Sequence, residues 1–261
     1  MSGEAGVVVD RSAGRWLGTG SAARALLVRE LVRLSRQPAR VMATLGIGVI
    51  VWVFLGSGFS GSFAGSVDYS AFVLPGVVGM VVMFSAVFSA LSLIEDRDAG
   101  YLRSVLVSPA SIDAVILSKV GAGGAVAALQ ALVLLPAAWM VGLEPGVAGI
   151  GLALVAMVLM AVGVAGVGLA LAWRTRSVAG YHGVMNMVLM PAWLLSGALF
   201  PLEEATGWLG AFGAVNPLAW VTTAMRGALT GDAVGAGVWI GSVAFAGGGV
   251  AAAWWAMRRG A

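Results

Sequence analysis

The sequence predicts an all-α membrane protein that crosses the bilayer six times and keeps both termini in the cytoplasm. Three observations support this prediction. Of the 261 residues, 60% are hydrophobic and only 10% are charged, against roughly 25% charged in a typical soluble domain. Long charge-free runs recur along the chain, and nearly all basic residues lie between alternate runs. A soluble fold of this composition would not have enough polar side chains to cover its surface.

Seven charge-free runs are long enough to cross the hydrocarbon core, which takes about 20 apolar residues in a helix. They cover 41–59, 69–94, 120–143, 145–173, 177–202, 205–225 and 233–257. The sixth run differs, since it contains Thr206, Asn216 and Pro217, and Asn-Pro favours a turn or a helix start. We expect that run to form two short interfacial or re-entrant helices. The six predicted spans are then about 41–59, 71–94, 120–142, 147–173, 178–200 and 234–256.

The distribution of basic residues predicts the orientation. With six spans, fourteen of the fifteen Lys and Arg residues fall on one side of the membrane, and Arg226 alone falls on the other. Basic loops remain in the cytoplasm. Residues 1–40 are therefore expected to form a cytoplasmic tail with an amphipathic helix, 41–257 the transmembrane domain, and 258–261 a second cytoplasmic tail.

The first 40 residues carry seven arginines and no apolar stretch before a cleavage site, so we do not expect a signal peptide. From residue 22 to residue 40 the pattern is amphipathic, with four arginines on one helical face: Arg29, Arg33, Arg36 and Arg40. Such a helix lies in the membrane interface with its arginines toward anionic headgroups. It is either a surface anchor alone or an anchor that also contacts a partner.

The loop between the second and third spans, residues 95–119, is unlike the others, and we call it the elbow. It opens with four charged residues in succession, Glu95 to Asp98. We expect a helix–turn–helix from a turn glycine, an apolar face, a helix breaker and a helix cap: Gly100, then Leu102, Val105 and Leu106, then Pro109 and Ser111. The elbow would present one apolar and one charged side to the cytoplasm. It is either an ordinary loop on the headgroups or a docking element.

The residue inventory excludes most chemistry within the chain. There is no cysteine and only one histidine, so a tetrahedral zinc site cannot form. Ser57 and His182 would lie near opposite faces of the membrane, on the order of 20–30 Å apart, too far for a catalytic Ser–His pair. The single lysine, Lys119, is followed by Val120, which rules out a phosphate-binding loop of the G-x-x-x-x-G-K-[ST] type. We therefore expect no catalytic residues and no cofactor on this chain.

Two motifs follow one another at a characteristic separation. The first starts at Glu95, has the sequence EDRDAGYLRSVLVSPAS and is followed by Lys119. The second starts at Leu195 with LSGALFP and continues through Trp208, the Asn-Pro-Leu at Asn216, and Arg226. Over roughly residues 20–257 the chain resembles the permeases of ABC-2 type transporters, most closely those of the daunorubicin-resistance and nodulation-factor exporters.

This resemblance implies a role for each segment. The elbow would be a coupling helix that inserts into an ATP-binding partner, through Glu95, Asp96, Arg97, Gly100, Leu102, Leu106, Ser108, Pro109 and Lys119. The helix at 22–36 would be a connecting helix along the membrane surface. Residues 202–226 would form short external helices that gate the outer end of the pathway, and the gate residues would be Gly197, Pro201, Trp208, Asn216, Pro217 and Arg226.

The resemblance also implies an assembly and a function. Two permease copies, expected as a homodimer in the bacterial cytoplasmic (inner) membrane, would bind two ATP-binding subunits that hold MgATP, and no nucleic acid. The complex would export a hydrophobic or amphipathic cargo such as a drug, a lipid or a lipid-linked glycan. The alternative is an ATP-independent membrane channel or scaffold.

Possible cargo contacts lie on the second and fifth spans: Met83, Asn186, Met190 and Ser196. Methionine adapts its shape to apolar ligands, and the two polar side chains could orient an amphipathic one. The same methionines could equally face lipid or pack within the bundle. The chain alone does not predict which cargo is moved.

Overall fold

The computed structural model describes residues 19–59, 68–102, 111–202 and 207–259. Within these ranges every regular element is a helix, which confirms the predicted all-α fold class. The elements are α1 (Thr19–Ser35), α2 (Pro38–Phe59), α3 (Tyr69–Asp98), α5 (Ile112–Leu134), α6 (Ala137–Met140), α7 (Val147–Arg174), α8 (Val178–Trp193), the π-helical turn η2 (Leu194–Ala198), α9 (Trp208–Val215), α10 (Pro217–Thr230) and α11 (Ala236–Arg259).

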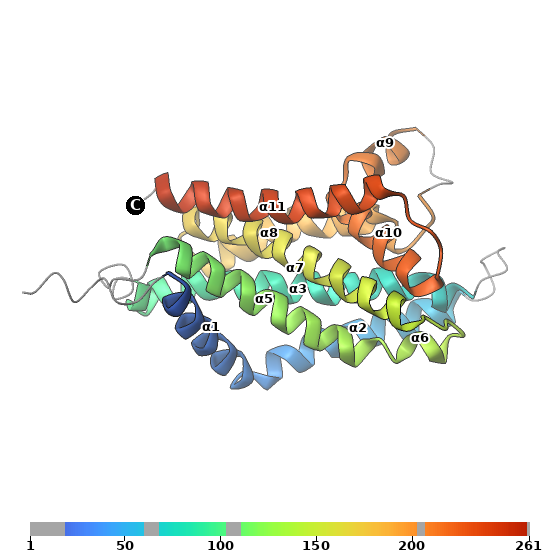
Figure 1. Ribbon diagram of the computed structural model, residues 1–261, viewed down its shortest axis with the longest axis horizontal. Coiled ribbons are helices and arrows are strands. Elements are labelled where there is room, and N and C mark those ends of the chain that lie inside the picture. The colour runs from blue at the N-terminus through green and yellow to red at the C-terminus, as the bar shows by residue number, and fades with distance from the viewer. Residues whose placement is uncertain (1–18, 60–67, 103–110, 203–206, 260–261) are drawn as a thin grey trace, which may run out of the picture.

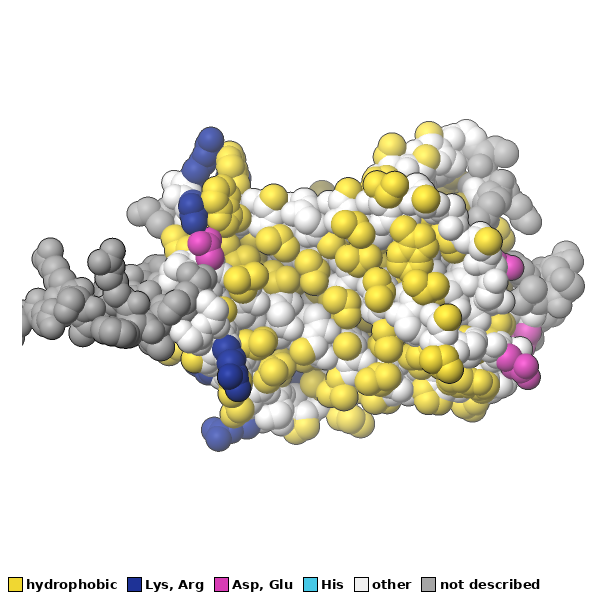
Figure 2. All heavy atoms as spheres, viewed as in Figure 1, with side chains coloured by type: hydrophobic (Ala, Val, Ile, Leu, Met, Phe, Trp, Pro, Cys, Tyr) yellow, Lys and Arg dark blue, Asp and Glu magenta, His cyan; other side chains and the backbone are white. Residues whose placement is uncertain are grey.

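Six helical segments of the described residues are long and apolar enough to cross a membrane, and they match the six predicted spans. They are Pro38–Phe59, Tyr69–Asp98, Ile112–Met140, Val147–Arg174, Val178–Ala198 and Ala236–Arg259. Figure 1 shows α3, α5, α7, α8 and α11 running along the long axis of the molecule. In Figure 2 the charged side chains gather at the two ends of that axis, and the surface between them is largely apolar. The chain is a multi-pass membrane protein.

Helix α3 lies at the centre of the bundle. It packs against α2, α5, α7, α8 and α10, and most of its residues are buried. One close approach depends on glycine, because a Cβ on Gly76 would lie 2.5 Å from the carbonyl oxygen of Ala198. Interiors packed this densely transmit displacement, so a movement of α3 affects most of the bundle.

A second extensive contact joins α7 to α11. Gly166 of α7 lies so close to α11 that an added Cβ would be 2.3 Å from the carbonyl carbon of Gly249. Small residues permit this approach between membrane helices. The pair therefore forms one wall of the bundle, and Figure 1 shows α11 extending along the whole of it.

Two helices extend further than the charge-free runs suggested. Helix α3 continues to Asp98, and α5 already begins at Ile112 rather than near residue 120. Glu95 and Asp96 therefore lie on the helix of the second span, and Lys119 lies on the helix of the third. Their charges are compatible with these positions because they pair with one another, as described below.

The amphipathic segment at the N-terminal side is divided between two helices. Helix α1 ends at Ser35, and Pro38 begins α2, where its fixed φ and missing N–H suit the first helical turn. Arg36 lies in the turn and Arg40 lies on α2. The prediction that these two arginines share one helical face with those of α1 was wrong, because the proline starts a new helix.

From residue 207 onward, the run 205–225 contains helix α9 and the first part of α10, which continues to Thr230. Their predicted re-entrant or interfacial placement stays a prediction. The Asn216 side chain accepts a hydrogen bond from the Leu218 N–H at 3.1 Å and so caps α10, with Pro217 in its first turn. Both helices lie at the end of the molecule away from the C-terminus (Figure 1).

Candidate functional site

An ionic network joins four helices at the end of the bundle that also holds the C-terminus. Its members are Arg29, Glu30 and Arg33 of α1, Arg40 of α2, Glu95 and Asp96 of α3, and Lys119 of α5. At its centre Lys119 Nζ lies 2.7 Å from Glu30 Oε1 and also binds Asp96. These three side chains are at most 6% exposed, so the centre of the network is removed from solvent.

Ser92 of α3 completes this centre. Lys119 Nζ donates a hydrogen bond to Ser92 Oγ at 2.7 Å, and the Ser92 hydroxyl donates to the carbonyl oxygen of Ser89 at 2.6 Å. Each of the three ammonium protons therefore has an acceptor, on Glu30, Asp96 and Ser92. A buried ammonium group tolerates burial only when it is paired and hydrogen-bonded in this way.

Three arginines surround the centre. Arg29 Nη2 and Arg33 Nη1 approach the same Asp96 oxygen at 3.0 and 2.9 Å. Arg33 and Arg40 both bind Glu95, and the Arg40 contact measures 3.0 Å. Burial lowers the pKa of the Arg29 guanidinium, but the hydrogen bond and charge of Asp96 outweigh burial, so that pKa lies above its ordinary value. Four cations therefore surround three carboxylates.

The network specifies the placement of its helices more than it stabilises the fold. The loss of hydration offsets most of the attraction in a buried ion pair, whereas removing one partner leaves an uncompensated charge at a cost of about 3–5 kcal/mol. Helices α1, α3 and α5 are therefore held in the arrangement that keeps Glu30, Asp96 and Lys119 together.

The network reaches the described beginning of the elbow. Gly100 ends α3 with a φ of 74°, a conformation that glycine adopts without strain. The guanidinium carbon of Arg29 lies 3.6 Å from the centroid of the Tyr101 ring, a cation–π contact. Leu102 is buried in the core. Helix α1 is thus attached directly to the first turn of the elbow.

Arg97 attaches the same region to α7. It donates to the carbonyl oxygens of Ala172 and Trp173, both at 3.1 Å, and to that of Thr175. These carbonyls lie at the C-terminal end of α7, where the helix dipole favours a cation. The base of the elbow is therefore fixed to α7 as well as to α1 and α5.

The predicted coupling residues divide into two groups. Leu106, Ser108 and Pro109 lie outside the described residues. Of the others, Asp96 and Lys119 are buried and paired within the chain. These two charges therefore do not lie on an exposed face of the elbow, because carboxylates and cations from α1, α3 and α5 meet one another. Their coupling role stays a prediction. The predicted cap at Ser111 is confirmed by a hydrogen bond from the Ala114 N–H at 3.2 Å.

The opposite end of the molecule brings together several predicted gate residues. Arg226 Nη2 donates to the Gly197 carbonyl oxygen at 2.6 Å and to that of Phe72 at 3.4 Å, and its guanidinium lies 4.1 Å from the centroid of the Phe72 ring. Gly197 has a φ of 74° within η2. Trp208 is 69% exposed and Pro201 is half-buried. Arg226 thus links α10 to η2 and α3.

Asn216 satisfies carbonyl groups at the end of α8. Its Nδ2 donates to the carbonyl oxygens of Ala192 and Leu195 at 2.6 and 3.0 Å, while its Oδ1 caps α10. Leu195 departs from helical φ and ψ angles, so the regular hydrogen-bond ladder is interrupted there. The asparagine therefore supplies the donors that this irregular turn needs.

The four predicted cargo residues do not converge. Met83 and Ser196 are buried inside the bundle, whereas Asn186 and Met190 lie on the exposed face of α8. Ser196 accepts a hydrogen bond from Thr222 at 3.4 Å. In this arrangement only the two residues on α8 are accessible from outside the chain. Within the described ranges, no group of three His, Asp or Glu residues could hold a metal ion.

Sequence reasoning missed two buried polar groups. Glu30 is the only acid of α1, and this single acid among basic and apolar neighbours was the available signal for a buried partner. In the interior, Ser85 donates to Gln130 Oε1, and Gln130 Nε2 donates to Thr44 Oγ1 at 2.9 Å. An isolated glutamine in an otherwise apolar span is a similar signal, because polar side chains are unfavourable there without a partner.

Comparison with known proteins gives consistent matches. Residues 21–230 match the family model described as ABC-2 type transporter. The ycf38 protein of Pyropia yezoensis, named as a transport permease, is 26% identical over 212 residues, which cover 78% of this chain and 72% of the relative. The YbhR protein of Escherichia coli strain K12, named as a multidrug ABC transporter permease, is 28% identical over 156 residues, which cover 59% of this chain and 42% of the relative. The family match includes every residue of the ionic network.

Proposed function

Because this chain belongs to the ABC-2 type transporter family and is a transporter permease subunit, we propose that a separate ATP-binding subunit drives it as an exporter. The cargo is hydrophobic or amphipathic and is moved outward across the membrane by alternating access. MgATP binds to the partner. The working assembly contains two copies of this chain and two ATP-binding subunits.

The observation that carries this proposal is the attachment of the elbow to the bundle. Arg29, Arg97 and Lys119 connect the base of the elbow to α1, α7 and α5, respectively. A force applied to the elbow by a partner would therefore reach three helices and the central helix α3 at once. Rigid-body movement of packed helices is an established form of such transitions.

The energy source follows from the thermodynamic linkage between ligand binding and conformation. A ligand shifts an equilibrium between two conformations only when it binds them with different affinities. In this proposal that ligand is MgATP on the partner, and the elbow carries the resulting movement to the permease. The charges of the network stay paired during the movement, because separating them would leave buried charges without a partner at a large cost.

The proposed orientation places the ionic network in the cytoplasm. The same end of the chain carries Arg174, Arg176, Arg258 and Arg259 in addition to the network, as the positive-inside rule requires. The membrane is the bacterial cytoplasmic membrane in this proposal. Helices α9 and α10 would then lie at the outer face and form the gate with Gly197 and Arg226.

The apolar surface of the bundle suits an apolar cargo. Of the four proposed cargo contacts, Asn186 and Met190 can be reached without a rearrangement of helices. Met83 and Ser196 become accessible only if α3 and η2 separate from their neighbours. The cargo would therefore contact Asn186 and Met190 on α8 first, and Met83 and Ser196 later in the transport cycle.

Purification of the chain from its own membrane in a mild detergent tests the existence of the partner. We expect a soluble subunit with a phosphate-binding loop to be recovered in about equal amount, identified by mass spectrometry. Recovery of the chain without such a subunit would contradict ATP coupling and favour the alternative, an ATP-independent channel or scaffold.

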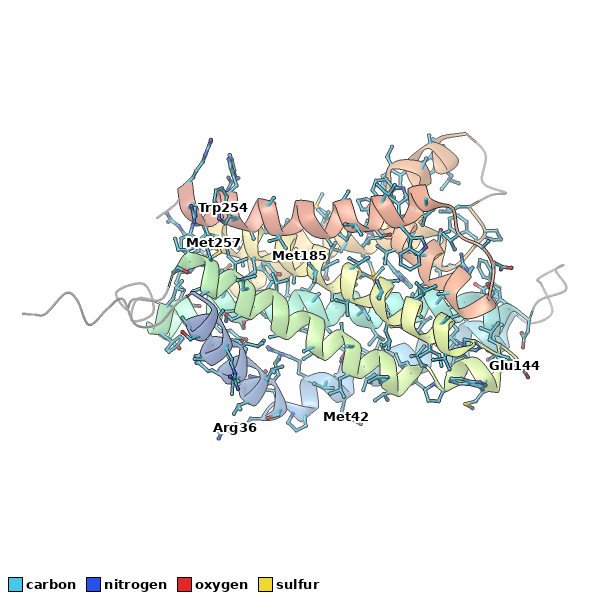
Figure 3. The ribbon with its side chains drawn as sticks, in the orientation of Figure 1. Arg36, Met42, Glu144, Met185, Trp254 and Met257 are labelled. Carbon is cyan, nitrogen blue, oxygen red and sulfur yellow. The ribbon has the colours of Figure 1, made fainter. Side chains whose placement is uncertain are left out.

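Coupling between the permease and ATP hydrolysis on the partner is tested with variants of two neighbouring arginines. Arg33 binds Glu95 and Asp96, whereas Arg36 is exposed and points away from the bundle (Figure 3). In the reconstituted complex, Arg33→Gln should lower cargo-stimulated ATP hydrolysis about tenfold, within the range measured for residues between communicating sites. Arg36→Gln is the matched control and should change it less than twofold. Equal effects of the two substitutions would contradict transmission through the network.

A further inference from the structure

A groove lies between α7 and α11, near the ends of these helices that carry arginines. It has a volume of about 540 Å³, and three alanines line it: Ala170, Ala252 and Ala256. Volumes of about 300–1,000 Å³ are typical of sites that hold small ligands. Because the groove lies between two membrane-spanning helices, its apolar part is accessible from the lipid phase.

Two arginines meet at one indole ring that borders this groove. The guanidinium carbons of Arg174 and Arg259 lie 5.2 and 4.6 Å from the centroid of the Trp255 ring. Arg174 and Trp255 both line the groove. Tryptophan is typical of the membrane–water interface, so the positive charges lie where lipid headgroups are found. Trp254 and Met257, labelled in Figure 3, mark this end of α11.

Four of the arginines at this end of the molecule bind carboxylates, and within the described residues these two do not. Arg258 forms an ion pair with Asp113 at 2.9 Å, and Arg29, Arg33 and Arg40 bind carboxylates of the ionic network. Over the ranges that the structure describes, neither Arg174 nor Arg259 has a carboxylate within ion-pair distance. Two like charges beside one ring repel each other, and an anion that binds both would offset that repulsion.

We propose that this groove is a binding site for one anionic phospholipid. An acyl chain lies along the alanines between α7 and α11, and the phosphate is bound by Arg174 and Arg259. Basic pockets between membrane helices at the cytoplasmic face bind anionic headgroups by this chemistry. A water-soluble anion would satisfy the arginines but leave the apolar groove empty, whereas a phospholipid satisfies both. The site does not depend on ATP coupling, so it goes beyond the function proposed above.

Native mass spectrometry of the purified chain tests the site directly. The probes are phosphatidylglycerol and phosphatidylcholine with identical acyl chains. We expect one phosphatidylglycerol to be retained per chain in preference to phosphatidylcholine. In the double variant Arg174→Gln/Arg259→Gln the affinity for phosphatidylglycerol should fall about 25-fold, because each arginine near the surface contributes roughly a factor of five.

Two further variants separate the headgroup contact from the groove. Arg176→Gln removes an exposed arginine of the same region and should change retention less than twofold. Ala252→Leu narrows the groove while leaving both arginines in place, and it should also abolish selective retention. Millimolar inorganic phosphate should not displace the lipid if the acyl chain is bound as well.

Three results would overturn the proposal. Equal retention of phosphatidylglycerol and phosphatidylcholine would show that no anionic site exists. Unchanged retention of phosphatidylglycerol in Ala252→Leu would show that the groove is not part of the binding site. A double variant that keeps its lipid but no longer recovers the ATP-binding subunit would assign the arginines to a protein contact. Lipid retention is measured on the chain alone, so a failure of ATP coupling leaves this test intact.

Discussion

The two ends of the molecule hold their helices together with different main contacts, although Arg97 at the network end also donates to backbone carbonyl oxygens. In the ionic network, Lys119 and three arginines bind carboxylates, and the central charges are buried. At the other end, Asn216 and Arg226 donate hydrogen bonds to backbone carbonyl oxygens near η2. The difference reflects the local backbone. The irregular turn at η2 leaves carbonyl groups outside the helical ladder, and these must be satisfied within the protein when lipid surrounds it.

This comparison suggests that the two ends respond differently to movement. Separating Lys119 from Glu30 and Asp96 would leave uncompensated buried charges, which is costly. The hydrogen bonds of Asn216 are neutral and contribute only about 0.5–1.5 kcal/mol each, and those of the Arg226 guanidinium contribute about 1.5–3 kcal/mol. Each of these bonds can be replaced by a bond to another carbonyl group. We therefore expect the network end to move as one body and the η2 end to rearrange.

The largest expected effect comes from breaking the centre of the network. Lys119→Met keeps much of the side-chain volume but removes the cation shared by Glu30 and Asp96. We expect the free energy of unfolding to fall by about 3–5 kcal/mol. Reversible unfolding in mixed detergent micelles, followed by circular dichroism, measures this change.

An exposed ion pair of the same helix provides the control. Asp113 of α5 binds Arg258, and these side chains are 35% and 48% exposed. Arg258→Gln should therefore lower the free energy of unfolding by less than about 1 kcal/mol. If Lys119→Met were equally mild, the network would not hold the helices in place, and the contrast between the two ends would disappear.

A smaller effect is expected at the opposite end. Asn216→Ala removes the cap of α10 and the two donors that serve Ala192 and Leu195. The free energy of unfolding should fall by about 2 kcal/mol, of which the cap accounts for about half. The same unfolding experiment measures this change in the free energy of unfolding.

The serine variant separates the two contributions of Asn216. Asn216→Ser retains a capping oxygen but not the reach of the amide donors, so it should recover about 1 kcal/mol relative to alanine. Complete recovery by serine would mean that the bonds to Ala192 and Leu195 contribute nothing, and would leave this end without the proposed carbonyl contacts.

Much of the fold was predictable because it depends on local patterns. Charge-free runs of sufficient length predicted all six spans, and Asn216 followed by Pro217 predicted the start of α10. Ser111 was also recognisable as a cap. In each case the physical requirement, a long apolar helix or an unsatisfied N–H group, is visible within a few neighbouring residues.

The ionic network was not predictable in the same way. The amphipathic pattern does not distinguish Arg33, Arg36 and Arg40. Among the residues that the structure describes, however, Arg33 and Arg40 bind carboxylates and Arg36 does not. That distinction depends on the break at Pro38 and on how α1 packs against α5, which are tertiary properties. A prediction from charge-free runs also ends each span at the first charged residue. A helix can nevertheless continue past charged residues when those charges are paired inside the bundle.

The smallest expected effect concerns a polar contact between the two ends. Gln130 joins Thr44 and Ser85 in the interior with neutral hydrogen bonds. In membrane proteins such bonds contribute about 0.6 kcal/mol on average, so Gln130→Leu should lower the free energy of unfolding by about 1 kcal/mol. Ser85→Ala is the control, and it should account for about half of that loss. A loss of 3 kcal/mol or more would equal the effect of a buried charge. It would show that burial in the bundle, rather than charge, distinguishes the network from the rest of the molecule.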